Sequence, residues 1–394
     1  MSQPVIHILA DTPDREAIRD AVAAICERFD DHYWREKDEA ASFPFEFSRA
    51  IAEGGWLGIT MPPEYGGAGL GVTEAAIMMQ TIGASAGAFA ACSTVHINIF
   101  APHAIVVHGS PEQRARMLPP LIAGQTRTCF GVTEPDAGLD TTKLTTFAAR
   151  DGDRYIVNGR KVWTSTAQQA DKILLLARTT PIEACKKPTD GLSLFYTDLN
   201  REFIEVREIH KMGRAAVDSN SLFIDGLPVP VADRIGEEGK GFKYILDSLN
   251  PERILNAAEA IGLGRRALAK AAQYANERVV FDRPIGKNQA IQHPLAESWA
   301  ELYAAELMTL RAAELYDAGK PCGAEANAAK FLAGDAAFNA CDRAVRVHGG
   351  MGYAREYDVE RYFREAVVTR LAPVSRELIL CYIAERVLGL PKSY

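Results

Sequence analysis

The sequence lacks the features that mark several classes of protein. Its seven cysteines are odd in number, scattered, and contain no CxxC pair. This argues against a disulfide framework or a zinc site and favours reduced thiols, all seven buried as small hydrophobic side chains. No long basic run is present and the net charge is −7. A clustered positive footprint is expected of nucleic-acid-binding proteins, so no nucleic-acid partner is predicted.

Long apolar runs and a signal sequence are also missing. Runs such as 173–177 are far too short to span a bilayer. Charged residues come early (Asp11, Asp14) and no apolar stretch follows a basic start, so no secretory signal is predicted. The 394 residues, 47% of them hydrophobic and 24% charged, suffice for two or three globular domains. We expect a cytoplasmic protein with no membrane partner.

The sequence patterns predict three regions in order along the chain: a helical region, a β region and a second helical region. Between Ala17 and Leu121, apolar residues recur at the three-to-four spacing of amphipathic helices. From Thr126 to about Ile235, short strand-like segments follow at regular spacing, which favours an antiparallel barrel or sandwich. Within it, Asn158-Gly159 predicts a tight hairpin turn between two short strands.

The final third is helical again. Asn250-Pro251 reads as a cap residue followed by a first-turn proline, and the Ala- and Leu-rich run after it reaches Arg278. Three more helices predict an antiparallel bundle. The fold class is therefore α+β and multidomain, with an N-terminal helical domain (1–125), a middle antiparallel β-barrel or sandwich domain (126–236) and a C-terminal four-helix bundle (237–394).

Several separated motifs, in this order, resemble the acyl-CoA dehydrogenase family of flavoproteins over nearly the whole chain. The family implies FAD, an acyl-CoA substrate, an electron-transfer flavoprotein as partner, and a homotetramer built as a dimer of dimers. The motifs are Met61-Pro-Pro-Glu-Tyr-Gly-Gly67, Val132-Thr-Glu-Pro135 with Ala137-Gly138, Asn158-Gly159 leading to Trp163-Thr-Ser165, Gly236-Glu-Glu-Gly-Lys-Gly241, Arg278-Val-Val-Phe281 followed by Gln289-Ala-Ile291, and His348-Gly-Gly-Met-Gly-Tyr353.

The resemblance implies that one loop and one strand end hold the flavin ring, which needs polar groups along one edge and apolar cover on its faces. Trp163 can cover a face, and Ser165 stands where the family commonly has a threonine that reaches N5. Alone, this stretch would read as a polar turn with a core tryptophan. Leu139 replaces a serine that often contacts CoA, so that contact becomes a backbone one. The loop residues assigned to FAD are Phe130, Val132, Thr133 and Gly138.

A second group resembles the segments that reach FAD from a neighbouring subunit or near its adenine half. An arginine can bind the cofactor diphosphate with a bidentate geometry that lysine cannot give. Glycines permit close backbone approach, although they also simply stop a helix. Arg346 stands where the family often has glutamine, and Ser375 is expected to keep a flavin-contacting hydroxyl. The residues of this group are Arg278, Phe281, Gln289, Arg346, Gly349, Gly350 and Ser375.

Dehydrogenation of an acyl thioester needs a carboxylate that removes the α-proton. In most of the family this glutamate precedes the last helix, where the chain has Pro373, which accepts no proton. A subgroup resembling isovaleryl- and long-chain acyl-CoA dehydrogenases carries it before an arginine on the first C-terminal helix, where Glu252-Arg253 stands. Glu252 is therefore predicted as the base. By position in the family, Asn250 and Arg253 lie near substrate and His96 lines the acyl pocket. The residues themselves favour a buried, satisfied histidine at position 96, and a helix-capping role already explains Asn250.

Two physical effects on Glu252 oppose one another. A helix N-terminus favours the ionised carboxylate and lowers its pKa, whereas closure over an acyl chain removes water and raises it. We expect the pKa to rise mainly when substrate binds, because a useful base ends near the working pH. Carboxylates are also ordinary in a helix's first turn, so the assignment depends on the family resemblance.

Three activities remain open at this point. The first is an FAD-dependent acyl-CoA dehydrogenase that forms the trans-2-enoyl-CoA and passes electrons to an electron-transfer flavoprotein. The second keeps the fold but changes the reaction to that of an oxidase, monooxygenase or desulfinase, as loss of the glutamate at position 373 would suggest. The third is a non-catalytic flavin-fold protein that binds DNA, against which the acidic balance argues. The presence of Glu252 favours the first.

Overall fold

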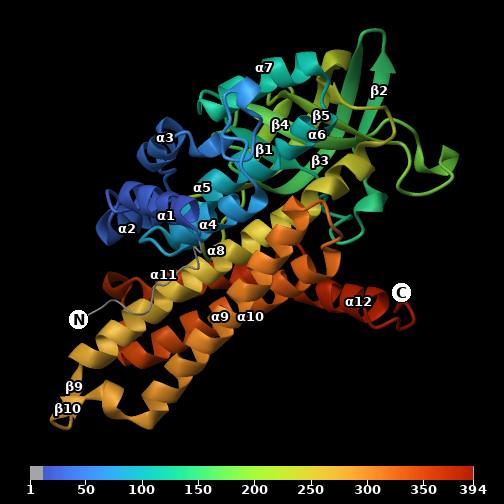
Figure 1. Cartoon of the computed structure of the whole chain (residues 1–394). Helices are drawn as coiled ribbons and strands as arrows, with labels where there is room; N and C mark the ends of the chain where they lie inside the picture. The colour runs from blue at the N-terminus through green and yellow to red at the C-terminus, as the bar shows by residue number, and fades with distance from the viewer. Residues whose placement is uncertain (1–11, 394) are drawn as a thin grey trace.

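The computed structural model describes residues 12–393, and the prediction about a secretory signal rests mainly on residues 1–11, which lie outside this range. Three regions follow one another along the chain, as predicted (Figure 1). The helices of the first region are α1 (Pro13–Cys26), α2 (Asp31–Glu39), α3 (Phe45–Glu53), α4 (Val72–Gly83), α5 (Ala88–Phe100), α6 (His103–His108) and α7 (Pro111–Ile122).

One apolar segment corrects the expectation that no run could span a bilayer. Ala88–His108 is long and apolar enough by length and composition, with a mean hydropathy of 1.4. It comprises α5 and α6, and 78% of the window is buried inside the protein. A largely buried helix of a protein core passes the same test, and here the segment packs against α4, α8 and the sheet.

The cysteines are all free thiols, and five are buried as predicted. Cys185 and Cys381 are partly exposed, so the expectation that all seven are buried is wrong for these two. Cys185 lies in the irregular stretch between two strands and Cys381 on the last helix, where neither packs into a core cluster.

The middle region is one eight-stranded sheet with the order β6-β7-β3-β2-β4-β5-β8, to which β1 adds by pairing with β4. Most pairings are antiparallel, and the β1–β4 and β2–β4 pairings are parallel. The strands are β1 (Thr128–Gly131), β2 (Phe147–Asp151), β3 (Arg154–Ser165), β4 (Lys172–Arg178), β5 (Leu192–Asp198), β6 (Ile204–Glu208), β7 (Ser219–Pro230) and β8 (Arg234–Ile235).

The hairpin predicted at Asn158-Gly159 is wrong. Both residues lie inside the single long strand β3, at an irregularity in its pairing with β7. A Cβ on Gly159 would lie 2.4 Å from the hydroxyl of Thr146, the residue before β2, so the neighbouring chain approaches too closely for a side chain. Asn158 Oδ1 accepts a hydrogen bond of 2.8 Å from Gly226 N. Strand bulges also favour glycine, so the pair marks a bulge and not a turn.

Strand β4 shows why the sheet is buried on both faces. Leu174 and Leu176 join a core with helices α6 and α7, through residues such as Ile105. Ile173 and Leu175 belong to a separate core with β3, β5 and β7. Because side chains alternate between the faces of a strand, alternate residues of this continuous apolar run pack into two different cores.

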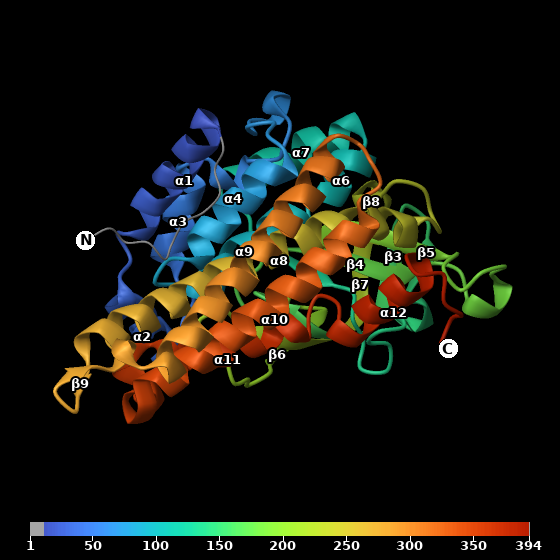
Figure 2. The same cartoon turned by 60° about the horizontal axis from the view of Figure 1, so that its bottom comes forward.

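The C-terminal region is a bundle of long helices that run side by side in both views (Figures 1 and 2). Its first helix begins earlier than predicted, because Asn250-Pro251 lies well inside α8. The short strands β9 (Val279–Val280) and β10 (Arg283–Pro284) form a hairpin at one end of the bundle. The helices are α8 (Gly241–Glu277), α9 (Gln289–Asp317), α10 (Gly323–His348), α11 (Val359–Ala366) and α12 (Arg376–Arg386).

Helix α8 is held against the N-terminal region by a close crossing with α4. A Cβ on Gly262 would lie 2.4 Å from the Gln80 carbonyl oxygen, and one on Gly83 would lie 2.7 Å from the Glu259 carbonyl oxygen. Only glycine at both positions lets the two backbones approach so closely. A buried ion pair between Arg265 and Glu306 joins α8 to α9 at this level. The crossing fixes which face of α8 lies against the N-terminal helices.

Candidate active site

Glu252 lies in the interior of the protein, eleven residues after the start of α8. Only 7% of its surface is exposed. Its carboxylate forms no hydrogen bond or ion pair with any residue from 12 to 393. A buried, unbonded carboxylate is rare in proteins and is typical of functional sites.

The pKa of Glu252 is raised to about 7, and burial is the largest cause. The positive charges of His96, Arg253 and Lys330 oppose this rise, and Glu259 adds to it. The predicted lowering by a helix N-terminus is wrong, since the first turn of α8 is far away. Burial by the protein alone already raises this pKa, whereas the rise expected on substrate binding stays a prediction. A pKa near 7 is suited to taking up a proton at neutral pH.

His96 lies on α5 and faces the same side of α8. It is the one residue of α5 that is not buried, with 14% of its side chain exposed. Its Nδ1 lies 2.5 Å from Glu259 Oε1, and its ring packs 4.7 Å from that of Phe100. Burial by itself would lower the pKa of His96, but the carboxylate of Glu259 outweighs it and raises that pKa. The charge of His96 acts on Glu252, and the predicted role of His96 in lining the acyl pocket stays a prediction.

The two other predicted substrate residues lie beside Glu252 on α8. Asn250 does not cap a helix, because α8 continues through it. Its side-chain oxygen instead accepts a hydrogen bond of 3.2 Å from Arg253 Nη1. The Nε atom of Arg253 is buried and has no hydrogen-bond partner among the described residues, and burial lowers the pKa of its guanidinium. Arg253 therefore retains a donor that a bound molecule could use.

The segment 371–375 carries no acidic side chain, and Pro373 lies exposed on it. Lys330 on α10 connects this region with the base: its charge acts on Glu252, and its ammonium donates to the Thr369 carbonyl oxygen. Ser375 caps α12, accepting from Leu378 N at 3.3 Å. Its hydroxyl thus has a structural partner within the chain.

The predicted flavin loop is anchored by a buried ion pair to which the sequence reasoning gave no role. Glu134 Oε1 lies 2.9 Å from Lys161 Nζ, which also donates to the Val132 carbonyl oxygen at 3.1 Å. The other Glu134 oxygen accepts from Thr145 N and Oγ1 at 2.7 and 2.8 Å. A lysine in the middle of an alternating strand was the signal that could have found this pair.

Beside this anchor, the loop and strand present an open surface suited to a flat ring. Trp163 has a left-handed backbone (φ 60°) and 59% of its surface is exposed. Thr133 and Ser165 are half-buried next to it, and a Cβ on Gly138 would meet nothing within 4 Å. Phe130 packs its ring 5.1 Å from Phe100, towards α5. An exposed aromatic face with hydroxyls and backbone groups at its edge fits an isoalloxazine ring. Leu139, also on the loop, is exposed.

Six residues of the second predicted group lie at the far end of the bundle from this loop, whereas Ser375 lies at the start of α12. Phe281 is 93% exposed with a left-handed φ of 51°, on the hairpin between α8 and α9. The Arg278 guanidinium forms no ion pair within residues 12–393, whereas Arg346 pairs with Asp342 at 2.9 Å. Gly349 and Gly350, where α10 ends, are exposed at the same end, as are Arg278 and Gln289. Figure 1 places the β9–β10 hairpin and the sheet at opposite ends. Within one chain, the ring contacts from Phe130 through Phe100 to His96 connect the loop with the side of α8 that carries the base, whereas the six residues at the far end stay away from the loop.

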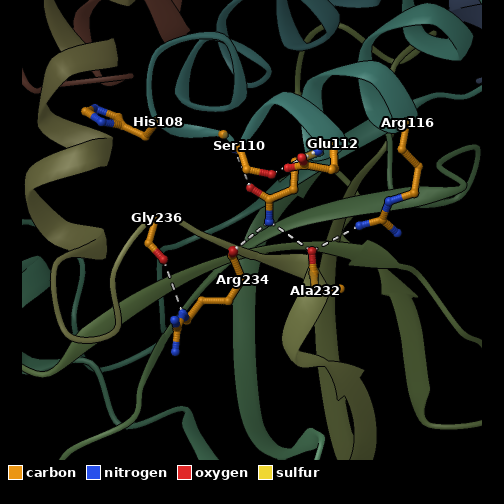
Figure 3. Close-up of a pocket in the computed structure, with 9 residues that line it drawn as sticks. His108, Ser110, Glu112, Arg116, Ala232, Arg234 and Gly236 are labelled. Atoms are coloured by element: carbon orange, nitrogen blue, oxygen red, sulfur yellow. Dashed lines mark hydrogen bonds between the residues drawn. The ribbon is translucent and has the colours of Figure 1, made fainter.

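A separate cavity of about 390 Å³ lies between α7 and the segment around β8 (Figure 3). Gln113 spans it, donating to the carbonyl oxygens of Ala232 and Arg234 at 2.9 and 2.8 Å. It contains none of the predicted catalytic or cofactor residues. Its polar groups are used to tie α7 to the sheet.

The fold and site together define a three-domain flavin-dependent oxidoreductase, with an aromatic ring platform on the sheet and a buried carboxylate on the first bundle helix. Comparison with known families identifies it further. The models of the acyl-CoA dehydrogenase N-terminal, middle and C-terminal domains match residues 12–125, 129–227 and 239–388. The chain belongs to the acyl-CoA dehydrogenase family, and it is an oxidoreductase of FAD-dependent type.

Individual relatives cover almost the full chain. Acyl-CoA dehydrogenase FadE12 of Mycobacterium bovis is 35% identical over 397 residues, covering 98% of each chain. Subunit CarC of the caffeyl-CoA reductase-Etf complex of Acetobacterium woodii is 34% identical and covers 84% of this chain and 87% of its own. Glutaryl-coenzyme A dehydrogenase, solved with glutaryl-CoA, superposes with a TM-score of 0.92 at 30% identity, covering 98% of each chain.

Proposed function

We propose that the protein catalyses α,β-dehydrogenation of an acyl-CoA thioester to the trans-2-enoyl-CoA, with Glu252 as the base. The observation that carries this proposal is the buried carboxylate of Glu252, which has a pKa of about 7 and no hydrogen-bond partner within the part of the chain that the structure describes. Pro373 supplies no competing base at the position usual in the family. The relatives named above support a CoA thioester as substrate.

The residues divide the work as follows. Glu252 takes the proton as the Cα–H bond breaks, and bound FAD supplies the acceptor for the hydride that leaves Cβ. Thr133, Trp163 and Ser165 would hold the flavin ring, with Phe130, Val132 and Gly138 lining the same loop. Arg253 would offer its unpartnered Nε to the substrate. Water exclusion around Glu252 keeps its carboxylate basic until the proton is transferred.

The opposite direction, reduction of a 2-enoyl-CoA, is a second candidate. CarC, a subunit of a caffeyl-CoA reductase complex, is a relative over most of the chain. By microscopic reversibility, a protonated Glu252 would then donate its proton to Cα. A pKa near 7 suits both roles, so the direction depends on the redox partner and not on this geometry.

Further expectations concern partners and location. An electron-transfer flavoprotein is the proposed redox partner, and the name of the CarC complex supports this. A homotetramer, built as a dimer of dimers, is proposed because Arg278, Phe281 and Gln289 are exposed far from the flavin loop of their own chain. A second chain would bring this group to the cofactor. A cytoplasmic location remains a proposal from the composition.

The test is anaerobic flavin bleaching by an acyl-CoA panel of butyryl-, isovaleryl-, octanoyl-, glutaryl- and 3-phenylpropionyl-CoA. The wild-type protein should purify yellow and be bleached by at least one member. Glu252→Gln keeps the size of the side chain and should retain FAD, yet lose bleaching by roughly a thousandfold or more. Near-normal bleaching of this variant would refute the assignment. Rapid peroxide formation in air would instead favour an oxidase.

A further inference from the structure

His96 and Glu259 form a pair that the assignment of Glu252 alone leaves unexplained. Glu252 and Glu259 are seven residues apart on α8, so they lie on one face, two turns or about 10 Å apart along the axis. His96 crosses this face from α5, and its Nδ1 contacts Glu259 at 2.5 Å. The side chain of Glu259 is 2% exposed and that of His96 is 14% exposed. A charge-assisted contact this short, away from water, fixes the position of the imidazole.

The other ring nitrogen of His96 has no use in the fold. Nε2 forms no hydrogen bond with any residue from 12 to 393. The rest of α5 is buried, so His96 marks the place where this helix borders accessible space. A histidine held only for packing would have both nitrogens satisfied or both buried among apolar side chains.

We propose that His96, held by Glu259, is a positioning residue that keeps a positive charge beside the general base Glu252. This inference rests on the proposed function of Glu252. Taking a carboxylate out of water disfavours its ionised form, and a nearby cation offsets part of that cost. Glu259 in turn keeps His96 protonated in surroundings that would otherwise discharge it.

The charged groups around both side chains come from every element packed against them. Facing Glu252 are His96 on α5, Arg253 and Glu259 on α8, and Lys330 on α10. Facing His96 are Glu252, Glu259 and, from the loop before β7, Arg214. Among the groups acting on Glu252, His96 is the strongest opponent of the burial effect, and it outweighs Glu259. Removal of His96 alone should therefore shift Glu252 further towards its neutral form than removal of the whole pair.

The test is the pH dependence of anaerobic flavin reduction between pH 6 and 9, with the acyl-CoA of the panel that reduces the wild-type protein fastest. His96→Gln should move the acidic limb of the pH–rate profile up by about one pH unit. This shift lowers the rate at pH 7 about fivefold and leaves the rate at pH 9 within about twofold of the wild-type rate. His96→Gln combined with Glu259→Gln should move the limb less. His103→Gln, a histidine on α6 that bonds Tyr316 at 2.9 Å, is the matched control and should not move it.

A second measurement does not depend on turnover. NMR spectra of ring-labelled histidine in the wild-type holoprotein, with the His96 signal assigned from its loss in His96→Gln, should show an imidazolium at pH 7. Glu259→Gln should make the ring neutral at the same pH. A neutral His96 in the wild-type protein, an unmoved limb in His96→Gln, or an equal loss of rate at every pH would overturn the proposal.

Failure of this inference can be told apart from failure of the proposed function. If Glu252→Gln still bleaches normally, Glu252 is not the base, whatever His96 does. If Glu252→Gln is inactive but the acidic limb of the pH–rate profile does not move in His96→Gln, the assignment of Glu252 as the base holds. Only the role of His96 is then wrong.

Discussion

Replacing Glu134 by glutamine should destabilise the protein strongly and loosen the loop that is expected to hold FAD. The glutamine preserves the size of the side chain but removes the charge opposite Lys161, whose side chain is 0% exposed. A buried ammonium without a counter-charge is among the most costly defects of a protein interior. The loop 132–137 loses its anchor at the same time, because Lys161 also binds the Val132 carbonyl oxygen.

The magnitude follows from the surroundings of Glu134. Burial by itself would raise the pKa of this carboxyl, but Lys161 and hydrogen bonds from Thr146 and Thr145 outweigh it and lower the pKa from 4.5 to about 2. A lowering of this size corresponds to roughly 3 kcal/mol of favourable interaction with the ionised form. The side chain is only 4% exposed, so solvent screens little of it. We expect Glu134→Gln to lower the free energy of unfolding by ~3 kcal/mol.

The Glu134–Lys161 pair also makes the free energy of unfolding depend on pH, and the sign of this dependence follows from the pKa of Glu134. Because the folded-state pKa is depressed, this stabilisation is complete above the ordinary value of 4.5 and disappears as the pH falls towards about 2. Urea unfolding of the apoprotein at pH 7 and pH 4 measures it, and FAD affinity follows from flavin fluorescence. Replacing both partners by Leu and Met should cost less than Glu134→Gln alone.

Glu205→Gln, which alters an exposed pair with Arg207, is the matched control and should leave unfolding unchanged. A Glu134→Gln variant as stable as this control would show that the ion pair with Lys161 does not stabilise the fold. The coupling between Glu134 and Lys161 would also be excluded if the two single replacements had strictly additive effects on the free energy of unfolding.

Two further predictions test the framework around the site. Gly262→Ala should lower the free energy of unfolding by ~1–3 kcal/mol, since its Cβ would meet the Gln80 carbonyl oxygen; helix propensity alone would make the change stabilising, so the sign in a urea titration decides. Arg278→Ala should weaken FAD binding about tenfold, or ~1.4 kcal/mol, without changing apoprotein stability. Arg283→Ala on the same hairpin is its control, and equal flavin retention by both variants after ultrafiltration would contradict the proposed role of Arg278.

Most helices and strands could be predicted from local sequence patterns, because their formation depends on interactions between residues that are close along the chain. At Ser110-Pro111 a cap residue followed by a proline predicts a helix start, and α7 begins there, with Gln113 N donating to Ser110 Oγ at 3.2 Å. The same local rules failed at Asn250-Pro251, since packing against α4, α9 and α10 carries α8 past the proline. They failed again at Asn158-Gly159, where neighbouring strands on both sides of β3 keep the chain extended.

The residues along the chain were enough to predict the order of the three domains, the family, and Glu252 as the glutamate to consider once Pro373 is found at the usual position. These follow from residue types at fixed positions along the chain. The ionisation of Glu252 depends on how the chain folds, and the folded structure decided it, because burial and the charges of His96, Glu259 and Lys330 come from three separate helices. It also decided that Glu134 and Lys161, 27 residues apart, meet beneath the flavin loop. Ionisation and anchoring depend on distances through space, which spacing along a chain does not contain.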